Sequence, residues 1–184
     1  EHDELHLRAL DFTVGQTQWT MPQGQEATAR YSNDSVTLDN FVLLRGDQRL
    51  TAAGTVAVGA ESSHLPNDLN VRLDNVQLKD INELVLGDRS LTGVLNATAD
   101  IRGTRSNPLV QSDFSITGGT VEGVNFNSFA GKANYSDRAV DVDVRLEQSV
   151  SAVLTAVGTI PVPKGPGGTA RTGEIDLAVK SSPI

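Results

Sequence analysis

The chain of 184 residues contains no cysteine. This absence excludes disulfides, thiolate metal sites and a cysteine nucleophile. Aromatic side chains are also scarce: one Trp, two Tyr and five Phe are too few for a surface of exposed rings that stacks sugars or bases. No apolar run approaches the roughly 20 residues of a membrane-spanning helix, so we expect no membrane span in this segment. The apolar material that remains is mostly Val, Leu, Ile and Ala.

The chain has fewer basic residues than acidic residues. The chain has 15 Lys and Arg against 23 Asp and Glu, which gives a formal charge of −8. No run of basic residues makes a local exception. A nucleic acid backbone and an anionic lipid surface would both be repelled on average. We therefore expect no nucleic acid partner.

The polar residues form no recognisable reactive site. His2 and His6 are four positions apart, about 13 Å along an extended strand, which is too far for one metal ion. Asp141 and Asp143 alternate with aliphatic residues and lack the glycine turn of a calcium loop. No serine, histidine and acid follow one another in a convincing catalytic order. We expect no catalytic residue, no metal ligand and no cofactor, and hence no enzyme.

The chain contains an internal repeat. Residues 31–58 align without a gap with residues 135–162, a displacement of 104 positions that leaves ten identical residues. The longest matching stretch is Leu50-Thr51-Ala52 with Gly54-Thr55, which recurs as Leu154-Thr155-Ala156 with Gly158-Thr159. A fixed period of this kind is typical of repeat arrays. We predict a first unit at 1–104 and a second, truncated unit of the same continuous sheet at 105–184, with a flexible loop at 163–172 that is rich in Pro and Gly.

Period-two alternation predicts β-strands along most of the chain. Residues 139–147 alternate apolar and charged side chains without a slip, which places four aliphatic residues on one face of a strand. Runs at 68–76, 93–101, 110–116 and 174–179 repeat the theme. Turn signals separate these runs at 33–34, 45–47, 107–108, 118–119 and 137–138. The pattern predicts an all-β, antiparallel meander.

One segment departs from this alternation. Asp80 and Glu83 have the spacing of a capping box, and Ile81, Leu84 and Val85 are spaced to share one side of a helix. The pattern predicts a short helix near 80–86. Its apolar side would pack on an apolar sheet face or at the edge of the sheet.

The aliphatic stripe that runs from strand to strand is the feature that carries functional information. A two-sheet sandwich would close the stripe into a core, whereas a single curled sheet would leave it as an open trough. Periodicity alone leaves both arrangements open.

Two motifs resemble those of a known protein family, and this resemblance favours the open trough over the sandwich. The stretch 91–108 begins Leu-Thr-Gly-Val-Leu and ends Gly-Thr-Arg-Ser-Asn-Pro, and 114–121 reads Phe-Ser-Ile-Thr-Gly-Gly-Thr-Val. With Ile81 and Leu84 ahead of them, these motifs resemble the AsmA-like superfamily and most closely its TamB-like proteins. The resemblance covers most of 65–162 and, through the repeat, much of 1–58. It implies an elongated antiparallel sheet curled lengthwise into an open trough with an apolar interior.

The resemblance also implies a setting. TamB-like proteins are anchored in the inner membrane of diderm bacteria, cross the periplasm and pair with an outer-membrane barrel of the Omp85 type, which is TamA-like. They are associated with phospholipid movement and with outer-membrane protein assembly. By similarity, this chain is expected to be a periplasmic part of such a protein.

The expected function is to shield phospholipid acyl chains in transit between the two membranes. Two alternatives remain open: a chaperone-like module that holds outer-membrane protein strands by edge pairing, or a purely structural β spacer. The residues expected to line the lipid-binding trough are Leu69, Val71, Leu73, Leu95, Ile101, Phe114, Ile116, Val140, Val142, Val144, Leu146, Leu154 and Ile160.

Overall fold

The computed structural model describes residues 3–14, 17–32, 34–59, 64–80, 91–162 and 174–182. Almost all of these residues belong to one antiparallel sheet. Its strands are β1 (Asp3–Leu7), β2 (Asp11–Val14), β3 (Thr17–Thr20), β4 (Ala27–Ser32), β5 (Ser35–Arg45), β6 (Gln48–Ala57), β7 (Pro66–Gln77), β8 (Val94–Thr104), β9 (Pro108–Val121), β10 (Val124–Ser136), β11 (Ala139–Glu147), β12 (Val153–Pro161) and β13 (Asp176–Ser181).

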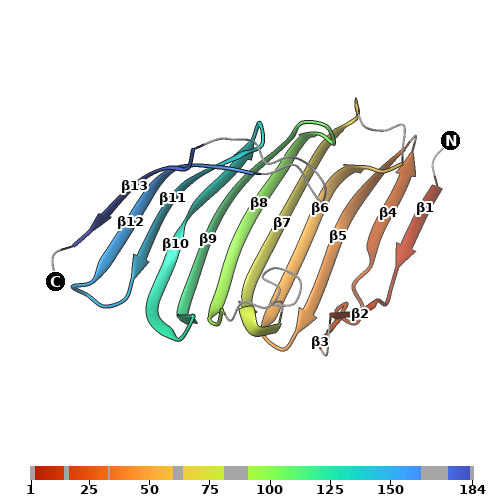
Figure 1. Cartoon of the computed structure of the whole chain (residues 1–184). Coiled ribbons are helices and arrows are strands. Elements are labelled where there is room, and N and C mark those ends of the chain that lie inside the picture. The colour runs from red at the N-terminus through yellow and green to blue at the C-terminus, as the bar shows by residue number, and fades with distance from the viewer. Residues whose placement is uncertain are drawn as a thin grey trace.

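From β4 onward the strands are adjacent in chain order, and β1 lies outside β4 (Figure 1). Strands β1 and β13 are therefore the two ends of the path, and the sheet does not close into a barrel. Strands β7 to β10 curve at their lower ends in Figure 1, which bends the sheet into an open trough. The all-β, open antiparallel sheet expected from the sequence is confirmed.

The strands form where alternation predicts them. Strand β11 has the predicted bounds 139–147, with Val140, Val142 and Val144 half-buried and Asp141 and Asp143 exposed. The signals at 45–47, 107–108 and 137–138 each fall where one strand gives way to the next, and Asp34 of the signal at 33–34 lies between β4 and β5.

The turn expected at Gly118 and Gly119 is wrong. Both glycines lie inside β9, and the hairpin turns at Glu122 and Gly123. Gly119 is needed for packing, because a Cβ there would lie 2.4 Å from Cζ of Phe126. Gly119 therefore lets an aromatic ring lie close to the strand, and the pair does not reverse the chain.

Two β-bulges interrupt the alternation, and both carry the sequence Leu-Asp-Asn. The register shifts between Leu38 and Phe41 in β5 and between Leu73 and Val76 in β7. In each bulge the asparagine has a φ of 56°, a left-handed conformation that Asn tolerates better than most residues. Each bulge adds one residue to its strand, so the apolar residues beyond it return to the same face.

Up to the β5 bulge, the internal repeat is preserved in the hydrogen-bonding register. Val36 pairs with Val56, and the positions 104 further on, Val140 and Ile160, pair in the same way. The amide of Val58 donates to the carbonyl of Asp34 at 2.7 Å, and the equivalent amide of Val162 donates to Arg138 at 2.8 Å. The division into units at residue 104 stays a prediction, because β8 and β9 flank that point within the same sheet.

Two sequence predictions fall mainly outside the described residues. The short helix near 80–86 is described only where Leu78, Lys79 and Asp80 begin a helical turn. The loop at 163–172 is not described at all. No helix in the described ranges is long and apolar enough to cross a membrane.

Buried side chains gather in two clusters that involve the same face of the sheet. Trp19, Met21, Ala27, Leu43 and Val76 form the first, against which Leu50, Leu73 and Leu95 pack. The second consists of Leu78, Ile116 and Phe126, with Leu91, Phe114 and Leu146 packed against it. The core is thus built where short segments fold over one apolar face.

Gly54 and Gly158 explain why the repeat keeps a glycine. A Cβ on Gly54 would lie 2.0 Å from the carbonyl oxygen of Asp68, and one on Gly158 would lie 1.9 Å from that of Asp176. Gly54 also has a φ of 123°, which side chains rarely adopt.

We predict that Gly54→Ala lowers the free energy of unfolding by more than about 3 kcal/mol, because backbone strain and a clash with backbone act together. Gly46→Ala is the control: its φ is 60° and no heavy atom lies within 4 Å of a Cβ there, so only about 1–2 kcal/mol should be lost. Equilibrium urea unfolding measures both. If both variants lose the same free energy of unfolding, the close approach of the Asp68 backbone to Gly54 does not exclude a side chain there.

Candidate functional site

The register of the sheet collects the aliphatic side chains on one face. In an antiparallel pair, residues directly opposite one another project from the same side of the sheet. Four consecutive rows of opposed residues cross from β7 to β12. We call the side that carries these rows the aliphatic face and the other side the polar face.

The first row is Leu69, Ile101, Val110, Tyr135, Val140 and Ile160. The second is Val71, Ala99, Ser112, Ala133, Val142 and Gly158. The third is Leu73, Ala97, Phe114, Gly131, Val144 and Ala156. The fourth is Val76, Leu95, Ile116, Phe129, Leu146 and Leu154. All thirteen residues expected to line the trough lie in these rows; that they bind lipid stays a prediction.

The aliphatic face is open and is not a closed core. Of the thirteen residues, only Ile116 is buried, at 5% exposure, and Leu154 is 40% exposed. The other eleven are half-buried. A second sheet packed on this face would have removed most of this surface from water. The face is therefore accessible over most of its length.

Sequence reasoning missed several residues of the face. Val110 and the alanines at 97 and 99 lie in runs with the right alternation, so their pattern was available. Val76, which is 1% exposed, lies beyond the Asp74-Asn75 bulge, where simple alternation fails. Phe129 makes an edge-to-face contact with Phe114, at 5.2 Å between ring centroids, and so adds an aromatic patch to the floor.

The polar face carries charges that pair across neighbouring strands. Asp113 lies directly opposite Lys132, at 3.6 Å between carboxylate and ammonium. Asn70 donates to Asp100 at 2.9 Å, and the hydroxyl of Thr159 donates to Asp141 at 2.6 Å. Exposed pairs of this kind contribute about 0–1 kcal/mol each. The main effect of these charged and polar pairs is to keep the polar face hydrated.

Two carboxylates on this surface have shifted pKa values. Hydrogen bonds from Arg72 lower the pKa of Asp74, an effect that partial burial opposes, and the same pairing raises the pKa of Arg72. The pKa of Glu26 is lowered first by its hydrogen bond from Arg8 and then by that from His6. All of these shifts favour the charged forms, as expected of stabilising ion pairs and not of an acid or base held ready for proton transfer.

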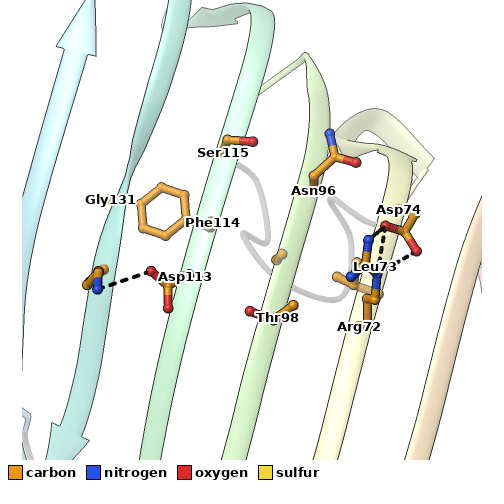
Figure 2. Close-up of a pocket in the computed structure, with 11 residues that line it drawn as sticks. Arg72, Leu73, Asp74, Asn96, Thr98, Asp113, Phe114, Ser115 and Gly131 are labelled. Atoms are coloured by element: carbon orange, nitrogen blue, oxygen red, sulfur yellow. Dashed lines mark hydrogen bonds and ion pairs between the residues drawn. The ribbon is translucent and has the colours of Figure 1, made fainter.

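Figure 2 shows a hollow over β7 to β10. Its volume is about 410 Å³, and it is lined by polar side chains of these strands together with the third-row residues Leu73, Ala97, Phe114 and Gly131. Its charged groups are already paired, Arg72 with Asp74 and Lys132 with Asp113. The hollow is therefore a shallow depression between ion pairs and offers little to a charged ligand.

The titratable residues form no metal site within the described ranges. His2 lies outside those ranges. His6 directs one ring nitrogen to Glu4 at 2.9 Å and the other to Glu26 at 2.5 Å. Asp141 and Asp143 are exposed on the polar face, as alternation predicts.

Comparison with known proteins agrees with the architecture. A family model described as the TamB C-terminal domain matches residues 39–182, which is well over half of the chain. No curated protein matches the chain, and neither does any solved structure. The chain therefore belongs to the TamB family, the bacterial envelope proteins that act with TamA-type partners in the translocation and assembly module for outer-membrane assembly.

Proposed function

We propose that the aliphatic face shields phospholipid acyl chains while they move between the inner and outer membranes. The observation that carries this proposal is the set of four aliphatic rows, continuous from β7 to β12 on the accessible face of one open sheet. Soluble proteins rarely leave so large a contiguous apolar surface without a ligand or partner for it.

The energetic need for such a face is large. Exposure of an acyl chain to water costs about 0.8 kcal/mol per methylene, so a chain of about 16 carbons meets a barrier on the order of 12 kcal/mol. A trough that replaces water along the path removes most of that barrier. The hydrocarbon would exchange one apolar surface for another at each step.

The composition of the face supports movement rather than tight binding. Its rows are built mainly from Val, Leu, Ile and Ala, with the aromatic rings of Phe114, Phe129 and Tyr135 among them. The hydroxyl of Ser112 donates to the carbonyl of Ala133 at 2.6 Å. A surface with so few polar groups gives an acyl chain no single preferred position. The protein would then act as a binding surface and not as an enzyme, which agrees with the paired and hydrated charges of the polar face.

The same proposal supplies the setting. The chain would be the periplasmic part of a protein anchored in the inner membrane of a diderm bacterium. Its parent would reach an outer-membrane barrel of the Omp85 type, a TamA-like partner. The net charge of −8 fits a path on which lipid is held by its chains and not by attraction of its headgroup.

We predict that Val142→Asp abolishes loading of phospholipid, because a carboxylate in the second row must be hydrated within the path of the acyl chain. Lipid extraction and native mass spectrometry of the purified protein measure the loading. Circular dichroism and urea unfolding establish that the variant is folded.

Leu109→Asp is the matched control. Leu109 is 46% exposed on the polar face and pairs with Arg102 in the register, so the new carboxylate gains a cationic neighbour. This variant should load lipid as well as the unaltered protein. If folded Val142→Asp loads as much lipid as Leu109→Asp, the aliphatic face is not the lipid path.

A second function, capture of a partner strand, is favoured by one observation. Strand β13 forms an end of the described sheet, and its Val179 is 56% exposed. Ser182 donates its amide to Val153 of β12, so alternation directs the amide of Val179 away from β12. A row of amides that has no strand partner within the described residues is suited to pair with an unfolded outer-membrane strand.

Val179→Pro tests this second function, because it removes one outward amide without deleting a bond to β12. Peptide capture, measured by fluorescence anisotropy with a labelled β-strand peptide, should fall sharply if β13 is the capture edge, whereas lipid loading should persist. Val179→Ala keeps the amide and serves as the control. Equal capture by the two variants would remove this edge as the binding site.

A further inference from the structure

The first repeat unit departs from the second in the hairpin that precedes β5. In the second unit, β9 and β10 pair in one register from Val110–Tyr135 to Val121–Val124 and remain in the sheet along their length. The corresponding part of the first unit forms two shorter antiparallel pairs in a different register, β1 with β4 and β2 with β3. The first unit therefore has its equivalent hairpin broken into two parts.

The hairpin is interrupted because its two sides contain different numbers of residues between the β1–β4 pairs and the β2–β3 pairs. Leu7 pairs with Ala27, and the next pair is Asp11 with Thr20. Three residues, 8–10, separate these pairs on one side of the hairpin, while six residues, 21–26, separate them on the other. The extra length, which includes a proline and Gly24 with a φ of 77°, forms a corner.

Beyond this corner, β2 and β3 lie over the aliphatic face. Trp19 is 4% exposed and Met21 is 7% exposed, and both belong to a cluster with Leu43 and Val76. Leu43 pairs with Leu50 and Leu50 with Leu73, so the cluster rests on the continuation of the third row. The short hairpin thus covers one end of the floor that is open further along the sheet.

The covering hairpin has few backbone ties to the sheet. Among the described residues, Thr20 with Leu44 is its single register pair to another strand, in contrast to the nine pairs that join β5 to β6. Trp19 and Met21 add apolar contacts to this attachment through their cluster with Leu43 and Val76. An attachment of this kind can open without breaking the main ladder.

The corner is held by ion pairs that cross it. Arg8, on the short side, donates to Glu26, on the long side, at 2.9 Å, and His6 contacts the same carboxylate at 2.5 Å. Gln25 donates to the carbonyl of Asn40 at 3.0 Å, which ties the corner to the β5 bulge. These contacts lie in the exposed corner and not under the hairpin.

We propose that β2 and β3, with Met21, form a lid that opens independently of the sheet and competes with an acyl chain for one end of the aliphatic face. The acyl chain as competitor rests on the proposed function; the independent opening of the lid does not. With the lid closed, Trp19 and Met21 cover the aliphatic face near Leu43 and Val76. With the lid open, the apolar floor extends from β12 to β5.

The sequence provides a specific reporter for this opening. Trp19 is the one tryptophan of the chain, so its fluorescence reports on the lid alone. Acrylamide quenching measures how accessible its ring is. The first test needs no ligand: Glu26→Ala should raise the quenching constant several-fold while far-UV circular dichroism of the sheet is unchanged.

Asp113→Ala is the matched control, because it removes a carboxylate paired with Lys132 on the distant polar face. It should leave quenching of Trp19 at the level of the unaltered protein. If Glu26→Ala also leaves quenching unchanged, the corner does not hold a lid and the proposal is overturned.

The second test adds a single acyl chain, a lysophosphatidylcholine with a C16 tail below its critical micelle concentration. Thr20→Cys with Leu44→Cys introduces a cross-strand pair into a chain without cysteine, so oxidation can lock the lid closed. The ligand should raise Trp19 quenching in the unaltered protein and in the reduced double variant. The oxidised form should show no rise and should bind less ligand.

If the ligand binds but Trp19 quenching stays unchanged in every form, the hairpin does not open, and the lid proposal is overturned. Absence of ligand binding in every form would instead contradict the proposed function. In that case the Glu26→Ala result still decides whether the hairpin opens.

Discussion

The structure depends on one constraint: the antiparallel ladder stays in a register that keeps every aliphatic row on the same face. Side chains alternate with a period of two, so a slip by one residue would move a whole strand's apolar residues to the polar side. The two Leu-Asp-Asn bulges show how the register survives an added residue. In each, an asparagine in a left-handed conformation takes up the added residue, and the apolar positions beyond it return to the aliphatic face.

Because no second sheet covers the described strands, the rows remain surface and not core. Stability then rests on the long ladders and on two local clusters, one under the β2–β3 hairpin and one around Ile116 and Phe126. The polar face contributes solubility through paired, exposed charges. This arrangement suits the predicted repeat of 104 residues, since further strands can extend the same face without a new core.

Much of the strand pattern could be read from alternation, while the internal repeat and the family resemblance supplied Leu154, Ile160 and the open trough. Strand β11 has the predicted bounds, and all thirteen residues selected for the trough share one face. The turn expected at Gly118 and Gly119 is absent, because a glycine that admits the ring of Phe126, as Gly119 does, looks the same in sequence as a turn glycine. Trp19 and Met21 were missed because β2 and β3 are four residues long and their position depends on a corner and on distant residues such as Val76.

Site-specific photocrosslinking in cells tests the central claim most directly. Val144 and Asp143 are consecutive residues of β11 that project from the aliphatic and polar faces, respectively. A photoreactive phenylalanine analogue at Val144 should form a phospholipid adduct that mass spectrometry detects, whereas the same group at Asp143 should not. No lipid adduct at Val144, or equal adducts at the two positions, would contradict transport of acyl chains along the aliphatic face.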